Sequence, residues 1–410
     1  MELNSLKSLL LSSIILTVVY VTFDKRPPNA MMTKQTVSIA VFGGSTSAGG
    51  GASSIQKGWT RVLEEKLEDD LQMRVAVSNF ARGATGADYF ATCFKRFLQQ
   101  PYDIVLLEFA INGGNVSRLV DAIRQEIDTP VILVKQLTCY GGDGALDARP
   151  SWPTAYTPQQ TAAFLYKLKE LDFVNNLMPS FGSPCSNASI EVLFNRTDSD
   201  GQHHLSDVGH KLLGSFVADQ ISHDYVAGTI GLEAWPVTPK HTNSRLDVCY
   251  HADPTAPTHR TSFQQQETSC EEKVCSIEKE FRGDGWAFES EVVNRPDKIC
   301  WISTLNNTRL TSRAPMSFQY LDLIMLLSPS SSANIGPARK GDTGIVLILC
   351  GEEVLRAVNA TWANPEMGLS HVEVERIDVQ CMNSTLSFVN IFAGVGRVKS
   401  KICGVVTYMS

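Results

Sequence analysis

A serine follows the first predicted strand of the chain in a setting that could present a nucleophile. In residues 37–42 every second side chain (positions 37, 39 and 41) is β-branched, which predicts a buried strand. The pattern breaks at Gly43, and Ser45 follows within a glycine-rich loop that runs to Gly51. Glycine permits positive φ and close backbone approach, so a serine here can be displayed to a substrate. On these residues alone, an ordinary strand end with a flexible turn is the alternative.

A nucleophilic serine needs a base and an acidic residue that orients the base. Histidine can remove the serine proton near neutral pH, and a neighbouring carboxylate stabilises the resulting cation. The polar run 198–210 supplies an acid, Asp200, and two candidate bases, His203 and His204. A metal site is not predicted for these histidines, because they lack a carboxylate or cysteine partner at zinc-like spacing.

The tetrahedral intermediate of acyl transfer also needs hydrogen-bond donors aimed at its oxyanion. A backbone N–H at a tight glycine and an asparagine amide can both serve. The candidates are the backbone of Ser45, Gly83 after the second predicted strand, and Asn112 after the third. No cofactor is required by this chemistry.

Alternating strands and helices are predicted to position these residues. Near-continuous apolar strands between helices are typical of a parallel sheet covered on both faces, and ligands of such sheets bind beyond the carboxyl ends of the strands. The candidate residues each follow a predicted strand, so we expect them to converge on one edge. The predicted strands are 37–43, 73–79, 103–111, 130–135 and 190–194, and the predicted helices are 58–71, 87–98, 116–127, 158–175 and 206–222.

With these blocks in order, residues 37–222 resemble the SGNH (GDSL-like) hydrolase superfamily. The four signature blocks correspond to Gly43-Gly-Ser45 with Gly49 and Gly51, to Gly83, to Asn112, and to the Asp/His run. The resemblance implies a flavodoxin-like three-layer α/β/α fold and a Ser-His-Asp centre that acts on esters. It also implies an oxyanion hole formed by the Ser45 backbone, Gly83 and Asn112.

The chain departs from the family pattern beside the nucleophile and beside the asparagine. The usual aspartate before the nucleophile is Gly44 here, and the residue after Asn112 is Gly113, where the family usually has aspartate. Neither position carries the chemistry.

A third departure concerns the base. Asp200 stands three residues before His203, as the family pattern requires, whereas His204 stands five residues before Gly209, which satisfies the second spacing. One residue is therefore inserted, and the base is either His203 or His204. The continuation of the block in register after residue 204 favours His204.

The N-terminal segment 1–34 predicts entry into the secretory pathway. Residues 8–23 carry no charge, and Asp24-Lys-Arg-Pro-Pro follows them as a juxtamembrane stop. We expect a signal-anchor or transmembrane segment with a short stem, and a protein that is either a single-pass membrane protein of the Golgi or cell surface, or secreted. Ten cysteines in the chain suit an oxidising compartment. Acceptor patterns for N-glycosylation occur at Asn115, Asn187, Asn195, Asn306, Asn359 and Asn383.

A second domain follows the α/β domain (35–228). Residues 229–265 contain scattered prolines and threonines and are predicted to be a linker. Residues 266–410 are predicted to form an all-β sandwich or jelly roll. It could bind glycans, with Trp286 and Trp301 stacking on sugars; a purely structural or protein-docking module is the alternative. Its predicted strands are 285–288, 299–304, 321–327, 344–349, 372–377 and 404–408.

Together these features predict a serine esterase that hydrolyses O-acyl esters. O-acetyl groups on carbohydrate are the expected substrate, because of the compartment and the accessory domain, so the expected partner is an acylated glycan or glycoprotein. The same centre could instead transfer the acyl group to a sugar hydroxyl. A non-catalytic glycan-recognition protein on a hydrolase scaffold is the rival, supported by the irregular Asp/His block. The formal net charge of −7 and the lack of a dense basic run argue against binding to nucleic acid.

Overall fold

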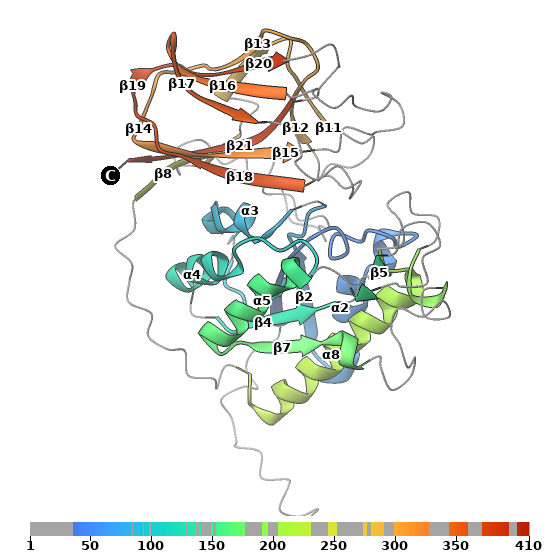
Figure 1. Cartoon of the computed structure of the whole chain (residues 1–410). Coiled ribbons are helices and arrows are strands. Elements are labelled where there is room, and N and C mark those ends of the chain that lie inside the picture. Colours follow the sequence, from blue (N-terminus) through green and yellow to red (C-terminus); the bar gives the residue numbers. More distant parts are fainter. Residues whose placement is uncertain are drawn as a thin grey trace, which may run out of the picture.

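The chain folds into an α/β domain and a β-sandwich domain that pack against each other (Figure 1). The predicted segment 1–34 lies outside the described residues, as do Asp200, His203 and Asn187. Within the described part of the chain, no helix combines the length and apolarity that a membrane span requires. The computed structural model describes residues 36–83, 85–92, 94–97, 100–127, 129–136, 139–140, 149–150, 153–176, 191–195, 204–230, 245–251, 274–276, 280–290, 299–327, 344–359, 371–392 and 400–409.

Five parallel strands form the sheet of the first domain, in the spatial order β2-β1-β3-β4-β7. This is the 2-1-3-4-5 order of flavodoxin-like folds, which confirms the predicted α/β class. The central strand of the sheet, β3, is buried throughout, as expected for a sheet covered on both faces. The strands are β1 (Thr36–Gly43), β2 (Arg74–Asn79), β3 (Ile104–Glu108), β4 (Val131–Lys135) and β7 (Lys169–Asp172), and a separate short pair is formed by β5 (Cys139–Tyr140) and β6 (Arg149–Pro150).

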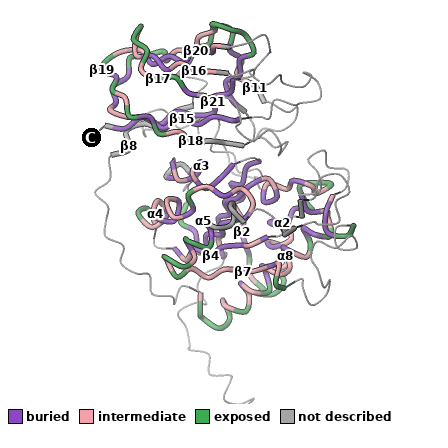
Figure 2. Tube along the Cα trace, viewed as in Figure 1, coloured by how far each residue is buried: buried purple, intermediate pink, exposed green. Residues whose placement is uncertain are grey.

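Helices cover the two faces of this sheet and enclose two apolar clusters (Figure 2). On one face, α2 (Trp59–Leu71) and α8 (Asp207–Ala227) pack together and bury Trp59 beneath them. The other face carries the remaining helices and a cluster of stacked and edge-on aromatic rings centred on Phe42. These remaining helices are α3 (Ala87–Thr92), α4 (Val116–Glu126), α5 (Pro153–Tyr166) and the short turn η2 (Phe94–Phe97), while η1 (Ile55–Lys57) precedes α2.

The fifth strand of the sheet differs from the prediction. The predicted helix 158–175 ends at Tyr166, because Lys167 adopts a left-handed conformation with φ of 51°. The chain then forms β7, which pairs with β4 from Lys169 to Asp172. The predicted strand 190–194 is wrong: residues 191–193 are helical, and residue 194 makes only an isolated bridge to residue 205. The apolar spacing of residues 169–172 is compatible with either a helix or a strand. These residues form a strand because they pair with the edge of β4.

The second domain consists of two β-sheets around a shared core, which confirms the predicted all-β class. Trp286 and Trp301 are only 6% and 8% exposed, so both belong to the core and their rings are not available to stack on sugars. One sheet has the order β10 (Phe281–Asp284), β13 (Thr308–Ser312), β20 (Leu386–Phe392), β16 (Gly344–Cys350) and β17 (Glu353–Asn359). The other has the order β11 (Ala287–Ser290), β12 (Ile299–Ser303), β21 (Ser400–Met409), β15 (Tyr320–Leu327) and β18 (His371–Ile377), joined by β8 (Arg245–His251) and β9 (Val274–Ser276), and a small pair is formed by β14 (Met316–Phe318) and β19 (Cys381–Ser384).

Two features tie the sandwich together. Disulfides join Cys300 to Cys403 and Cys350 to Cys381. Strand β8 lies within the stretch 229–265 that was predicted as a linker, and it pairs antiparallel with β21. The partner strand β21 lies more than 150 positions later in the sequence, so the local pattern around β8 could not reveal the pairing.

The sandwich rests on helices α3 and α4 of the first domain (Figure 1). A single apolar cluster contains Tyr89 and Leu119 from these helices together with Ile324 and Val406 from the sandwich. Burial of apolar surface across a boundary favours association of the two parts. The two domains therefore share a core.

Candidate active site

The hydroxyl of Ser45 lies against the ring of His204. Ser45 Oγ and His204 Nε2 are 2.7 Å apart, within hydrogen-bond distance. Ser45 stands directly after β1 and is half-buried, while His204 is 7% exposed. These two residues are 159 positions apart in the sequence, and the fold brings them together at the carboxyl edge of the sheet.

Tight turns hold the serine in place after β1. The N–H of Gly50 donates to Ser45 O at 2.7 Å, and the N–H of Ala48 donates to Gly44 O at 3.1 Å. A methyl group at Gly51 would lie 2.7 Å from His204 Cβ and 2.3 Å from a backbone oxygen, and the φ of Gly51 is +86°. The glycines of this loop therefore make the room that the histidine occupies.

Asn195 connects the glycine loop to the histidine segment. Its backbone N–H donates to His204 O at 3.0 Å, and its side-chain Nδ2 donates to Gly51 O at 2.9 Å. Just beyond, Ser206 caps α8 by accepting a hydrogen bond from the N–H of Gly209. Asn195 is also a predicted glycosylation acceptor, and a glycan would be attached to this Nδ2 atom. In this structure, Nδ2 instead donates its hydrogen bond to the glycine loop.

Asn112 lies against Gly44, the residue before Ser45. A methyl group at Gly44 would stand 1.8 Å from Asn112 Oδ1, so the asparagine side chain fills the space next to Ser45. A side chain at position 44 would therefore collide with Asn112 in this structure. Gly113 has a φ of 62°, a left-handed conformation that glycine adopts without strain, which accounts for the second departure.

The third predicted oxyanion donor lies next to the end of β1. The N–H of Arg82 donates to Gly43 O at 3.0 Å, so the chain continues alongside β1 after β2 ends. Gly83 is the next residue and is buried. Ser45, Gly83 and Asn112 thus follow β1, β2 and β3, three neighbouring strands of the sheet.

Two buried residues that support the site were not predicted as functional. The first is His210 on α8, whose Nδ1 accepts the N–H of Trp59 at 3.2 Å and whose Nε2 donates to Gly50 O at 2.9 Å. Burial lowers the pKa of His210 to about 4, so the ring is neutral and links α2 to the glycine loop. In the sequence, its position on the apolar face of the predicted helix 206–222 is the feature that indicates a buried histidine.

The second is Glu108, at the end of β3. Its side chain is fully buried, and Ser47 Oγ donates to Glu108 Oε2 at 2.8 Å. Burial raises the pKa of Glu108 to about 8, although Ser47, Gln136 and the Gly44 amide nearby lower it slightly. Glu108 Oε1 has no partner of normal hydrogen-bond geometry among the described residues. A lone carboxyl in an otherwise apolar strand was the signal in the sequence.

The protonation of Glu108 makes stability depend on pH. The folded state keeps a proton that the unfolded state releases above its ordinary pKa, so the free energy of unfolding falls as pH rises from the unfolded value of 4.5 to about 8. His210 acts in the opposite direction, but only between its folded pKa of about 4 and its ordinary value of 6.5. The window from about pH 6.5 to about pH 8 therefore isolates Glu108.

We expect the wild type to lose about 2 kcal/mol of stability across this window relative to Glu108→Gln, because each pH unit is equivalent to about 1.4 kcal/mol. Urea unfolding at both pH values measures the difference. Glu65→Gln, at a surface carboxylate with a side chain 61% exposed, is the matched control and should follow the wild type. Parallel pH dependence of the wild type and Glu108→Gln would contradict the prediction.

The remaining predicted site residues differ in how far the structure describes them. Asp200, His203 and Asn187 lie outside the described residues, so the acidic member of the centre remains a prediction. Among the other glycosylation candidates, Asn115 caps α4, Asn306 and Asn383 are exposed, and Asn359 ends β17.

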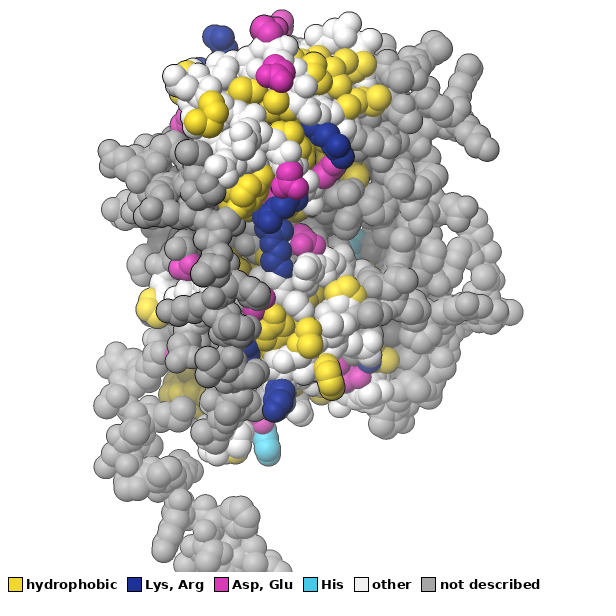
Figure 3. Space-filling view, turned by 60° about the vertical axis from the view of Figure 1, so that its left-hand side comes forward, with side chains coloured by type: hydrophobic (Ala, Val, Ile, Leu, Met, Phe, Trp, Pro, Cys, Tyr) yellow, Lys and Arg dark blue, Asp and Glu magenta, His cyan; other side chains and the backbone are white. Residues whose placement is uncertain are grey.

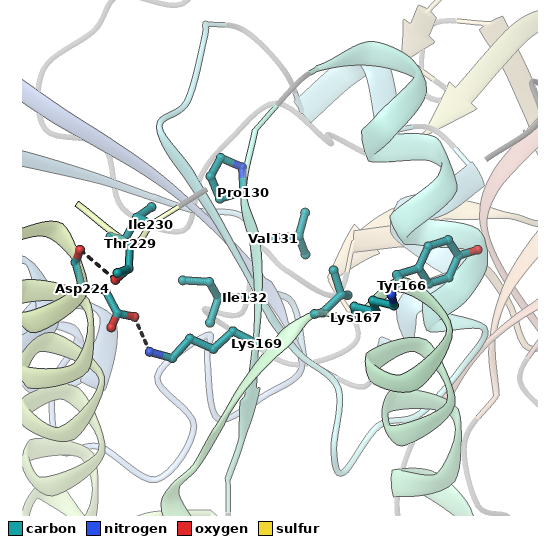
Figure 4. A pocket seen from close by; sticks show the side chains of 10 residues that line it. Pro130, Val131, Ile132, Tyr166, Lys167, Lys169, Asp224, Thr229 and Ile230 are labelled. Atoms are coloured by element: carbon teal, nitrogen blue, oxygen red, sulfur yellow. Dashed lines mark hydrogen bonds and ion pairs between the residues drawn. The ribbon is translucent and has the colours of Figure 1, made fainter. Parts of the chain in front are cut away.

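A separate pocket lies away from the serine (Figure 4). Pro130 and Val131, at the start of β4, line it together with Ile230 after α8, and an ion pair between Lys169 and Asp224 borders it. Because the sheet is parallel, these residues lie at the amino ends of the strands, whereas Ser45 follows the carboxyl end of β1. The pocket is therefore no part of the serine site.

Comparison with known proteins supports the fold. No protein-family model matches the chain, and no curated protein matches it in sequence. Among solved structures, the chain is similar to a two-domain esterase (CEX) active on acetylated mannans, with a TM-score of 0.56 and 14% identity over 92% of both chains. The same esterase crystallised with mannopentaose gives a TM-score of 0.55, with 14% identity over 92% of this chain and 91% of that chain.

A lipase/acylhydrolase from Enterococcus faecalis matches only the first part, with a TM-score of 0.33 and 21% identity over 46% of this chain and 96% of that chain. At these identities the likeness shows the fold alone. The chain therefore shares the fold of the two-domain esterase over most of its length, with an α/β domain joined to a β-sandwich domain.

Proposed function

We propose that the protein is a serine hydrolase that cleaves O-acyl esters, with Ser45 as nucleophile and His204 as general base. The observation that carries this proposal is the 2.7 Å hydrogen bond between Ser45 Oγ and His204 Nε2. A histidine within hydrogen-bond distance of a serine can activate the serine as a nucleophile, and the carboxyl edge of a parallel sheet is where ligands of such folds bind.

The reaction proceeds in two transfers. Ser45 Oγ attacks the acyl carbon while His204 Nε2 accepts the hydroxyl proton, and the same proton then passes to the departing alcohol oxygen. Water attacks the acyl-serine with His204 again as base, which releases the carboxylic acid and restores the serine. The Asn112 amide beside Ser45, with the backbone of Ser45 and Gly83, is the proposed oxyanion hole, and Asp200 is the proposed partner of His204.

O-acetyl groups on a carbohydrate are the proposed substrate. The likeness to an esterase active on acetylated mannans spans both domains, and this supports a polysaccharide substrate. The two disulfides among the described residues of the sandwich are compatible with an extracellular or secretory protein.

Release of acetate from O-acetylated mannan by the full chain tests this proposal. We expect acetate to appear, and a fluorophosphonate that reacts with activated serines to block it. Release of acetate from p-nitrophenyl acetate but not from acetylated polysaccharides would support the esterase activity and refute the carbohydrate substrate. Appearance of the acyl group on added mannooligosaccharides would identify a transferase. A chain that neither labels nor releases acetate would be a non-catalytic glycan-recognition protein.

The glycine loop allows a sharp test of the geometry. Gly51→Ala is expected to lower kcat/KM for p-nitrophenyl acetate about 100-fold, because the new methyl group pushes His204 away from Ser45 and a displacement of about 1 Å has an effect of that size. Gly49→Ala is the matched control: Gly49 also has positive φ, at +91°, but a methyl group there has no neighbour within 4 Å. Equal losses in both variants would show that backbone strain, not contact with His204, is responsible.

A further inference from the structure

A buried aspartate of the sandwich binds an arginine of the hydrolase domain. Arg118 Nη2 donates to Asp322 Oδ2 at 2.8 Å, and the Asp322 side chain is 0% exposed. Asp322 lies on β15 of the sandwich, and Arg118 lies in the first turn of α4. In Figure 3, basic and acidic side chains gather at the level where the two domains meet.

The sandwich holds this carboxylate ready for Arg118. Arg376 Nε donates to Asp322 Oδ1 at 2.8 Å, and Tyr408 Oη donates to Asp322 Oδ2 at 2.7 Å. The rings of Tyr320 and Tyr408 stack at 4.7 Å, and the Arg376 guanidinium lies 5.1 Å from each. Burial by itself raises the pKa of Asp322, but the two arginines and the tyrosine outweigh it and hold the pKa below its ordinary value. Asp322 is therefore a buried anion with fixed orientation.

On the hydrolase side, Arg118 belongs to the segment that carries Asn112. We define the Asn112 loop as residues 112–115. Its last residue, Asn115, caps α4 by accepting the N–H of Arg118 at 3.0 Å, and the N–H of Asn115 donates to Asp88 Oδ2 at 2.7 Å. Arg118 Nη1 also lies 3.9 Å from Asp88 Oδ1. Arg118 thus binds Asp322 through Nη2, while its Nη1 lies near Asp88, the carboxylate that accepts the N–H of Asn115.

The Asn112 loop also makes backbone hydrogen bonds of its own. The N–H of Gly113 donates to Phe109 O at 2.9 Å, and Gly113 O accepts the N–H of Ala87 at 3.0 Å. Gly113 and Gly114 both have positive φ, so the chain here turns sharply and depends on its neighbours for orientation. The loop places the Asn112 side chain on Gly44, beside Ser45.

We propose that the β-sandwich positions the Asn112 loop through the Asp322–Arg118 ion pair, which makes the second domain part of the catalytic unit. Arg118 is a positioning residue: it touches no reacting atom and acts through Asn115 and Asp88. The catalytic consequence rests on the proposed esterase function, whereas the structural coupling does not.

Amide hydrogen exchange in the full chain tests the coupling without reference to activity. Arg118→Met and Asp322→Asn are each expected to speed exchange of the Gly113 and Asn115 amides about tenfold, within the usual range of coupling between sites. Arg309→Gln is the matched control, because Arg309 pairs with Glu352 inside the sandwich, and it should leave both amides unchanged. Unchanged exchange in Arg118→Met would overturn the proposal. Arg118→Lys, which keeps the charge, serves where the methionine variant does not fold.

Kinetics then separate positioning from general destabilisation. For the folded fraction of Arg118→Met, we expect kcat for p-nitrophenyl acetate to fall about tenfold with KM unchanged, because a displaced donor acts on the transition state. The double variant with Asp322→Asn should be no slower than the single variant, since both changes break one link. A lower unfolding temperature with wild-type kcat would refute the positioning role. If the wild type itself is inactive, the esterase proposal fails, and hydrogen exchange still decides the coupling.

Discussion

Replacement of Ser45 by alanine is expected to abolish covalent labelling by a fluorophosphonate and to lower kcat about 10⁶-fold, the loss typical of removing a nucleophile of this kind. The reason is direct: Ser45 Oγ is the oxygen that faces His204 Nε2, and alanine offers no oxygen to acylate. Labelling detected by mass spectrometry, together with acetate release, measures both effects. The unfolding temperature should be unchanged, since Ser45 is half-buried at the end of β1.

Ser53→Ala provides the matched control for this experiment. Ser53 lies in the same connection between β1 and α2, but its hydroxyl donates to Asp207 at 2.8 Å and not to a histidine. We expect labelling of this variant at the wild-type rate. Equal labelling of wild type and Ser45→Ala would place the reactive group elsewhere and overturn the proposed mechanism.

His204→Gln is expected to lower kcat by a similar factor, about 10⁶-fold, because the serine then has no base to accept its proton. Glutamine keeps a polar side chain of similar length, so KM for p-nitrophenyl acetate should change little. The comparison with His203→Gln is decisive, because the two histidines are neighbours in the sequence. We expect His203→Gln to retain kcat within about threefold of the wild type, as is typical of substitutions outside a functional contact.

The reverse result would identify His203 as the base and would contradict the geometry around Ser45. Circular dichroism of both variants controls for folding. In His204→Gln, the hydrogen bond from the N–H of Asn195 to the backbone oxygen of residue 204 can still form, so we expect this variant to fold.

The sequence by itself determined the class of fold and the position of Ser45 after the first strand. The apolar strands between helices predicted a parallel sheet, because only strands buried on both faces are apolar throughout. The break from strand to glycine at Gly43 predicted that Ser45 follows the strand in a tight loop, and local backbone chemistry governs that feature. Gly83 and Asn112 were predicted from the same local signal, a break directly after a strand.

The sequence was less informative wherever two local patterns fitted equally well. Residues 169–172 suit a helix as well as a strand, and only pairing with β4 decides between them. The stretch around β8 carries a weak strand pattern that becomes a strand through its partner β21. Local propensity cannot report a partner that lies far away in the sequence.

Only the tertiary structure decided which histidine meets the serine. The two spacings of the Asp/His block leave His203 and His204 as alternatives, and only the continuation of the block in register favours His204. In the structure, the room made by Gly50 and Gly51 lets His204 Nε2 lie 2.7 Å from Ser45 Oγ. Likewise, only the structure shows that a side chain at position 44 would collide with Asn112. The Asp322–Arg118 pair joins residues 204 positions apart, and no local pattern marks either one. These features depend on distances between segments that are set by the packing of the whole chain, and that is why they appear only in three dimensions.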